Sequence, residues 1–205
     1  MYHLELTYFD FHGGRAEPAR LAMHIGGVEF DDIRFPFSEF AEIKKTTPLN
    51  QVPTLKIDGL LVTQSNSINR FVAKLAGLYP ANDLQALLCD EIMDALEDIT
   101  HKIVATFRLE GEALRSARQA LADGPLSEYL QWVQAKLEQQ GGQYFIENRL
   151  TIADLKVFVW TRSLLSGHLD HIPRTLVENV APKLHLHMQR IAQIPAIADY
   201  YAAAT

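Results

Sequence analysis

Residues 50–68, NQVPTLKIDGLLVTQSNSI, contain a proline before a strand-like run, a tight turn and the start of a helix. Apolar runs on both sides of Asp58 and Gly59 predict a hairpin, because this dipeptide is favoured in tight turns between strands. After Ser65 the apolar residues recur every three or four positions, which indicates a helix. The stretch therefore predicts strand, turn, strand and helix in succession.

The preceding residues predict further elements of the same kind. Polar and apolar residues alternate in HLELTYF, residues 3–9, which predicts a strand ending near Tyr8. The next segments predict, in order, a short helix, a second strand and another helix: residues 19–27, 28–35 and 38–45. Together with the opening stretch, this order predicts a small α/β domain with a mixed sheet over residues 1–76.

The rest of the chain is predicted to be helical. GLYPAND, residues 77–83, concentrates turn-forming residues and is expected to be a linker. From residue 84 to 205 the apolar residues follow a helical period, so a second, all-α domain is expected. Beyond the first long helix, up to about Ile103, periodic stretches lie at 125–140, 152–165, 178–193 and 196–203.

Composition limits the classes of function. The chain has 205 residues, a formal charge of -6 and no cluster of Lys and Arg, so a nucleic-acid partner is not expected. No run approaches the roughly 20 apolar residues of a membrane span. The single cysteine, Cys89, excludes a disulfide within the chain, and the N-terminus lacks the pattern of a secretory signal. We therefore expect a cytoplasmic protein without a membrane partner.

Tyr8, Ser65 and Pro53 each have two interpretations. Tyr8 follows a strand and precedes a glycine loop, so its hydroxyl either donates to an anionic ligand or lies in the core. Ser65 is expected at the N-cap of a helix, where it satisfies a backbone amide or helps to bind an anion. Pro53 begins a strand, and sequence alone favours a trans bond before it.

Other polar patterns favour structure over chemistry. Thr151 and Asp154 have the spacing of a capping box, which predicts a helix start and not a catalytic aspartate. His185 and His187 are two residues apart and would point to different faces of a helix, so they do not suit a shared metal. No metal requirement is expected.

A set of short motifs in the right order resembles the cytosolic glutathione transferases. The motifs are LTYFDFHGGRAEPARL, PLNQVPTL and TQSNSINRF, followed by TIADL in the helical half. The resemblance is closest to the sigma class, which includes glutathione-dependent prostaglandin D synthases and the S-crystallins. It implies a thioredoxin-like N-terminal domain that binds glutathione and a helical domain that contributes the electrophile pocket.

The resemblance implies a role for residues of the first domain. Tyr8 matches the tyrosine whose hydroxyl stabilises the glutathione thiolate. Val52 and Pro53 match the motif in which a cis-proline presents backbone to the cysteinyl part of glutathione, which reverses the trans expectation. Gln64 and Ser65 match the pair that binds the γ-glutamyl carboxylate.

Further matches and departures concern the ends of glutathione. Lys44 and Gln51 match positions that bind the glycyl end and the peptide backbone, and Asp98 matches an aspartate that reaches across a homodimer. Arg15 matches an arginine that aids thiolate formation, although HGGRAEP is one residue longer than the sigma-class loop. Phe40 replaces a tryptophan that donates to the glycyl carboxylate, so we expect weaker glutathione binding.

The resemblance implies a glutathione transferase that adds the thiolate to small hydrophobic electrophiles. Phe9, Phe107 and Trp160 are the candidate residues of the electrophile pocket. Alternatives are a glutathione-dependent isomerase like prostaglandin D synthase and a noncatalytic, S-crystallin-like protein. Asp94, Glu97 and Asp98 also resemble an acidic cluster that binds divalent cations in some relatives.

Overall fold

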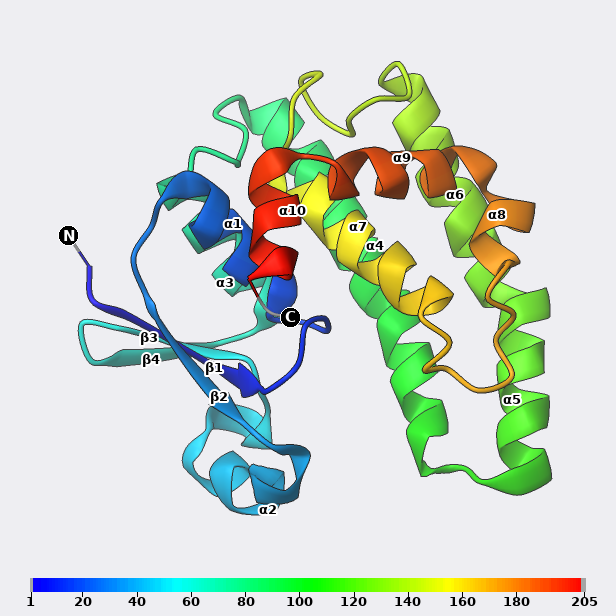
Figure 1. The fold of residues 1–205 in the computed structure, drawn as a ribbon, viewed down its shortest axis with the longest axis horizontal. Coiled ribbons are helices and arrows are strands. Elements are labelled where there is room, and N and C mark those ends of the chain that lie inside the picture. The colour runs from blue at the N-terminus through cyan, green and yellow to red at the C-terminus, as the bar shows by residue number, and fades with distance from the viewer. Residues whose placement is uncertain (1, 204–205) are drawn as a thin grey trace.

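A computed structural model describes residues 2–203. Its N-terminal part has a four-stranded sheet of order β2-β1-β3-β4, in which β1 is parallel to β2 and antiparallel to β3. The elements are β1 Leu4–Phe9, α1 Glu17–Gly26, β2 Asp31–Phe35, α2 Phe40–Ile43, β3 Thr54–Ile57, β4 Leu60–Thr63 and α3 Ser65–Leu75. Figure 1 shows α1 and α3 together on one side of this sheet. This is the predicted α/β arrangement with a mixed sheet.

The opening stretch folds as predicted. β3 and β4 pair in antiparallel fashion, and the turn residues Asp58 and Gly59 have φ of 48° and 91°. Positive φ at both positions is typical of the tight turn that matches the twist of a hairpin. In β1, alternate residues Leu4, Leu6 and Tyr8 are buried, which confirms the period-two pattern.

The C-terminal part is helical, as predicted. Its helices are α4 Asp83–Ala105, α5 Gly111–Asp123, α6 Pro125–Gln139, α7 Ile152–Leu165, α8 Leu176–Val180, α9 Pro182–Ala192 and α10 Pro195–Ala202. Eleven of the fourteen residues of α7 are buried, and it packs against α1, α4 and α9. Figure 1 shows α7 in the middle of the molecule, with α10 crossing beside α1. Helix α7, together with α10, therefore joins the two halves in a shared core. None of the helices among residues 2–203 is long and apolar enough to cross a bilayer.

Two helix predictions need correction, and one helix was not predicted. Residues 38–45 form only the short α2 with 3-10 turns on both sides, since the segment lies between Pro36 and Pro48 and has no long apolar stripe. The periodic stretch 178–193 is two helices, because Pro182 lacks an amide hydrogen and starts α9. Helix α5 was not among the predicted stretches, although Leu114, Ala117 and Leu121 recur at helical spacing and are half-buried beside the buried Arg118 and Ala122.

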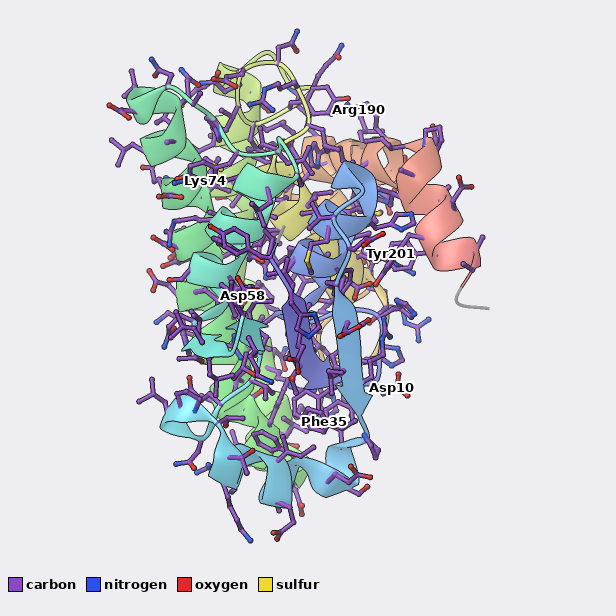
Figure 2. The ribbon with its side chains drawn as sticks, turned by 90° about the vertical axis from the view of Figure 1, so that its left-hand side faces the viewer. Asp10, Phe35, Asp58, Lys74, Arg190 and Tyr201 are labelled. Carbon is purple, nitrogen blue, oxygen red and sulfur yellow. The ribbon has the colours of Figure 1, made fainter. Side chains whose placement is uncertain are left out.

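Aromatic rings pack where β2 meets α2. The Phe9 ring centroid lies 5.0 Å from that of Phe35, 4.4 Å from that of Phe37 and 5.1 Å from that of Phe40. Figure 2 shows Phe35 at this end of the sheet, above the short helices of residues 37–50. The rings hold this segment against the end of β1, next to Tyr8.

The capping box at the start of α7 is confirmed. The Asp154 carboxylate accepts hydrogen bonds from the Thr151 amide at 2.9 Å and the Thr151 hydroxyl at 2.8 Å. It also accepts one from the Phe145 amide at 3.1 Å, and Nε2 of His187 lies 3.0 Å away. All of these groups are buried, so Asp154 satisfies polar groups of three separate segments.

Asp154→Ala is expected to lower the free energy of unfolding by about 2 to 4 kcal/mol, because it removes a helix cap and leaves buried donors unpaired. The measurement is urea unfolding at fixed protein concentration. Asp199→Ala is the control, since Asp199 is an exposed aspartate of α10. Equal stability of the two variants would contradict the structural role of Asp154.

Candidate functional site

The Tyr8 side chain lies at the carboxyl end of β1 and is 6% exposed. Its hydroxyl oxygen accepts a hydrogen bond from the Arg15 amide at 3.1 Å. An oxygen that accepts this bond keeps its own hydrogen available to donate. Burial raises the pKa of Tyr8, while the Arg15 amide and the charges of Arg15 and Arg20 lower it. The phenol is therefore a protonated donor at neutral pH.

Gly14 allows the loop after β1 to approach the Tyr8 hydroxyl. Its φ is +67°, and a Cβ atom at this position would lie 2.6 Å from the Tyr8 oxygen and 2.9 Å from Cζ of Phe11. No side chain fits in that space. A glycine at this position thus lets the Arg15 amide reach the Tyr8 hydroxyl.

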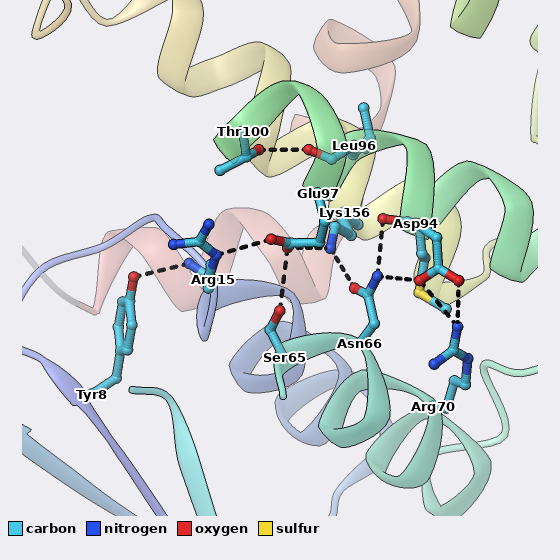
Figure 3. Close-up of polar contacts among 11 residues, drawn as sticks. Tyr8, Arg15, Ser65, Asn66, Arg70, Asp94, Leu96, Glu97, Thr100 and Lys156 are labelled. Atoms are coloured by element: carbon cyan, nitrogen blue, oxygen red, sulfur yellow. Dashed lines mark hydrogen bonds and ion pairs between the residues drawn. The ribbon is translucent and has the colours of Figure 1, made fainter. Parts of the chain in front are cut away.

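The Arg15 side chain points away from Tyr8 and towards α4. Its Nε donates to Glu97 Oε2 at 2.9 Å. The hydroxyl of Ser65, at the start of α3, donates to Glu97 Oε1 at 3.2 Å. Figure 3 shows Glu97 between Arg15 and Ser65. One carboxylate of the helical part therefore contacts both the loop after β1 and the start of α3.

Lys156 of α7 completes this arrangement. Its Nζ lies 2.6 Å from Glu97 Oε1 and also donates to Oδ1 of Asn66, the residue after Ser65. Asn66 in turn donates to the Met93 carbonyl at 3.0 Å. We call Tyr8, Arg15, Ser65, Asn66, Glu97 and Lys156 the interdomain network, because they come from both parts of the chain.

The pKa values of the network reflect burial and charge pairing. Burial would raise the pKa of Glu97, but the charges of Lys156 and Arg15 outweigh it and hold this pKa at about 2. Burial lowers the pKa of Lys156, and the charge of Glu97 opposes that effect. At neutral pH the centre of the network is an ionised carboxylate beside the Arg15 guanidinium and the Lys156 amine.

Ser65 occupies a different position from the one predicted. It is the first residue of α3, and Gln64, with φ of 78°, is the N-cap residue. The Ser65 hydroxyl donates to Glu97 instead of accepting from a helix amide, because the carboxylate lies within hydrogen-bond distance. Gln64 is exposed beside the helix start. Both residues lie where the free amides of α3 are available to a ligand.

The peptide bond between Val52 and Pro53 is cis, as the resemblance implied. Pro53 is buried and Gln51 is exposed, directly before β3. Lys44 lies after α2, with Nζ 5.9 Å from the centroid of the Phe40 ring. The structure thus brings Lys44 and Phe40 together at the end of the sheet that carries Tyr8.

The remaining predicted residues lie apart from one another. Phe107 follows α4 and is 59% exposed, with the Arg118 guanidinium 5.7 Å from its ring centroid. Trp160 is buried within α7, and Phe9 packs against Phe40. Among residues 2–203 no ring contact joins Phe9, Phe107 and Trp160. Asp98 is an exposed residue of α4.

Two of the three acidic residues in the candidate cation cluster contact basic side chains. Asp94 lies 3.0 Å from Arg70, while Glu97 contacts Arg15 and Lys156. Within residues 2–203, no three His, Cys, Asp or Glu side chains group in a way that could hold a metal ion.

Lys156 and Asn66 are residues that sequence reasoning missed, and Glu97 was considered only as part of an acidic cluster. Asn66 follows the predicted Ser65 and carries no signal of its own. Lys156 does, because it is the one charged residue in LKVFVW, residues 155–160, an otherwise apolar run of a helix. A lysine on a buried helix needs an acidic partner, and that requirement indicates a site.

The sheet, the following helical part and the cis-proline beside Tyr8 define a two-domain protein with a thioredoxin-like first unit. The chain belongs to the glutathione S-transferase family. Residues 4–74 match the family's N-terminal domain, and residues 97–204 match its C-terminal domain.

Individual relatives match over almost the whole chain. Glutathione S-transferase 3 of Caenorhabditis elegans is 33% identical, over 98% of this chain and 97% of the relative. The sigma class transferase of Fasciola hepatica is similar in structure, with a TM-score of 0.82, 28% identity and coverage of 100% and 97%. The prostaglandin synthase D of Nilaparvata lugens gives a TM-score of 0.83 at 26% identity, covering 98% and 97%.

Glu97→Gln is expected to remove a pH-dependent part of the stability. In the folded wild type the pKa of Glu97 is lowered from 4.5 to about 2. The ionised carboxylate therefore stabilises the fold fully above about pH 4.5, and this contribution falls as the pH drops towards 2. The shift corresponds to roughly 3 kcal/mol at neutral pH. Urea unfolding measured from pH 7 downwards checks the expected convergence of wild type and variant.

Glu91→Gln is the matched control for that measurement. Glu91 also lies on α4 and pairs with a lysine, Lys136, at 2.8 Å, but it is 42% exposed. An exposed pair contributes about 0 to 1 kcal/mol, so this variant is expected to remain close to wild type at every pH. A constant difference between wild type and Glu97→Gln across the pH range would contradict the assignment to Glu97.

Proposed function

We propose that the protein is a cytoplasmic, sigma-class-like glutathione transferase that binds glutathione at the Tyr8 end of the sheet and adds its thiolate to small hydrophobic electrophiles. The observation that carries the proposal is the Tyr8 hydroxyl, which accepts from the Arg15 amide and keeps its hydrogen to donate. Membership of the glutathione S-transferase family supports glutathione as co-substrate. The single cysteine of the chain, Cys89, fits a cytoplasmic location.

The proposed chemistry is stabilisation of a thiolate. A thiol with a pKa of about 8.5 is only a few per cent ionised at pH 7, and each unit by which the pKa falls increases the thiolate nearly tenfold. A hydrogen bond from Tyr8 stabilises the charged sulfur more than the thiol. The thiolate then attacks an electrophilic carbon, and the leaving group departs with the bonding pair.

The rest of glutathione is proposed to bind along the same edge. The backbone of Val52, before the cis bond, pairs with the cysteinyl part, and Gln64 and Ser65 bind the γ-glutamyl carboxylate at the start of α3. Lys44 supplies charge to the glycyl carboxylate. Gln51 contacts the peptide backbone.

Two parts of the proposal lie outside the first domain. An apolar pocket for the electrophile is proposed beside the helical domain, with Phe9, Phe107 and Trp160 as its candidate residues. A homodimer is proposed, in which Asp98, exposed on α4, faces the γ-glutamyl amine bound to the second copy. The proposed domains are residues 1–76 and 84–205, joined by the linker 77–83.

A glutathione-dependent isomerase is the second candidate. The similarity to the prostaglandin synthase D of Nilaparvata lugens favours it, and the same thiolate would attack a peroxide oxygen of the substrate. Product analysis distinguishes the two, since a transferase yields a glutathione conjugate and an isomerase returns free glutathione.

Tyr8→Phe is expected to raise the pKa of bound glutathione and to lower kcat/KM by about tenfold or more, because the sulfur loses its donor. Thiolate absorbance titrated with pH, and conjugation to a chloronitrobenzene, are the two measurements. Tyr79→Phe is the control, because it also loses a hydrogen bond, at 2.9 Å to Asp90, outside the site.

The outcomes separate the candidates. Activity unchanged in Tyr8→Phe would assign the donor to another group. Binding of glutathione without turnover across a panel of electrophiles would favour a noncatalytic, S-crystallin-like protein. A wild type that fails to bind glutathione would exclude the proposed function.

Gly14→Ala tests whether the close loop places the donor. The new Cβ would lie 2.6 Å from the Tyr8 oxygen, so we expect displaced Tyr8 or Arg15 and a raised pKa of bound glutathione. Gly27→Ala is the matched control, because Gly27 has nearly the same φ, +63°, and no atom within 4 Å of the added carbon. Both variants carry a backbone cost of about 1 kcal/mol. Equal glutathione titrations would contradict the role of Gly14.

A further inference from the structure

A buried lysine of the helical domain touches the proposed glutathione site only through other residues. Lys156 lies in the fully buried stretch Ile152–Thr161 of α7 and is itself 7% exposed. Its amine contacts Glu97 and Asn66, whereas within residues 2–203 the hydrogen bonds of Tyr8 and Arg15 do not include Lys156. A buried amine is costly, so its presence in an apolar helix calls for a role.

We propose that Lys156 is a positioning residue of the glutathione site. It holds the Glu97 carboxylate in place, and Glu97 in turn orients Arg15, which contacts Tyr8, and Ser65 at the start of α3. The inference rests on the proposed function, since the groups that it orients are those assigned to glutathione. It adds a residue of the second domain to the machinery of the first.

The contacts divide Glu97 between two sets of partners. Oε1 contacts Lys156 at 2.6 Å and accepts from Ser65 at 3.2 Å, and Oε2 accepts from Arg15 at 2.9 Å. Lys156 therefore fixes the oxygen shared with Ser65, which turns the other oxygen towards Arg15. The Arg15 amide then donates to Tyr8 at 3.1 Å, so the order of contacts runs from α7 to the phenol.

Asn66 gives Lys156 a second path to the start of α3. The Asn66 side chain accepts from Lys156 and donates to the Met93 carbonyl at 3.0 Å and to Asp94 at 2.5 Å. These contacts hold the first turn of α3 against α4. The free amides of that turn are the ones proposed to bind the γ-glutamyl carboxylate.

The charges around Glu97 support the positioning role of Lys156. The groups that contact Glu97 are Arg15 from the loop after β1, Ser65 from α3 and Lys156 from α7. Asn66 contacts Lys156, and Tyr8 contacts the Arg15 amide. Asp94, on the same helix as Glu97, contacts Asn66 and Arg70. Without Lys156, Glu97 would keep only one cationic partner in a buried position, and protonation would become easier.

The test compares Lys156→Met with Lys156→Arg in the full-length protein. Lys156→Met removes the charge at similar length, and we expect the pKa of bound glutathione to rise by about one unit, a tenfold loss of thiolate. KM for glutathione is expected to rise several-fold while KM for the chloronitrobenzene stays unchanged. In Lys156→Met, glutathione binding is expected to weaken at acidic pH, because Glu97 becomes protonated there. Lys156→Arg is expected to restore the pH dependence of the wild type.

Lys136→Met is the matched control. Lys136 also joins a helix of the second domain to a glutamate of α4, at 2.8 Å from Glu91, but away from Ser65 and Arg15. This variant is expected to keep the glutathione titration and both KM values. A change as large as that of Lys156→Met would show that any lysine bridge to α4 has the same effect, and would overturn the proposal.

The double variant Lys156→Met with Glu97→Gln covers the case in which Lys156→Met fails to fold, because it removes both charges together. Only the path through Glu97 and Arg15 leads to Tyr8, whereas the path through Asn66 leads to the start of α3 and affects KM for glutathione. The thiol titration of the double variant is therefore expected to equal that of Glu97→Gln alone. An additional shift in the double variant, or a wild-type titration in Lys156→Met, would overturn the role of Lys156. A wild type that fails to bind glutathione would instead overturn the proposed function, and this role with it.

Discussion

The ionised carboxylate of Glu97 is the contact on which the arrangement of the two domains depends. A buried charge costs several kcal/mol unless it is paired and hydrogen-bonded, so Arg15, Ser65 and Lys156 must all reach it. Apolar packing between α1 and α7 brings the domains together but tolerates small displacements. Hydrogen bonds of 2.6 to 3.2 Å to one carboxylate tolerate much smaller displacements. They therefore fix the loop after β1 and the start of α3 relative to α4 and α7.

The groups proposed to hold glutathione depend on the same contacts. Tyr8 receives its backbone donor from Arg15, whose side chain is held by Glu97, and Ser65 gives its hydroxyl to the same carboxylate. Gly14 adds a steric condition, because any side chain there would meet the Tyr8 oxygen. In the proposed function the first domain carries the glutathione site, and its geometry depends on contacts from the second.

Local pattern predicted most of the fold and the edge of the sheet that carries the site. Alternation identified β1, the Asp58 and Gly59 turn identified the hairpin, and the family motif indicated the cis bond before Pro53. The network was not predictable in this way. Ser65 and Glu97 are 32 residues apart, and Lys156 and Glu97 are 59 apart, so no local spacing encodes either contact. Helix α5 was missed although Leu114 and Leu121 are a local signal for it, and its two buried residues are Arg118 and Ala122.

The protonation states constrain how a thiol could be activated. Burial raises the pKa of Tyr8, so this phenol is a poor base at neutral pH and acts by donating. Glu97 has a pKa of about 2 and is held between two basic side chains, so it is also a poor proton acceptor. In the proposed reaction the thiol proton must therefore pass to water, and the protein lowers the thiol pKa by stabilising the anion that remains. Such stabilisation requires a donor in a fixed place, and for this reason a buried network behind Tyr8 has a direct bearing on the chemistry.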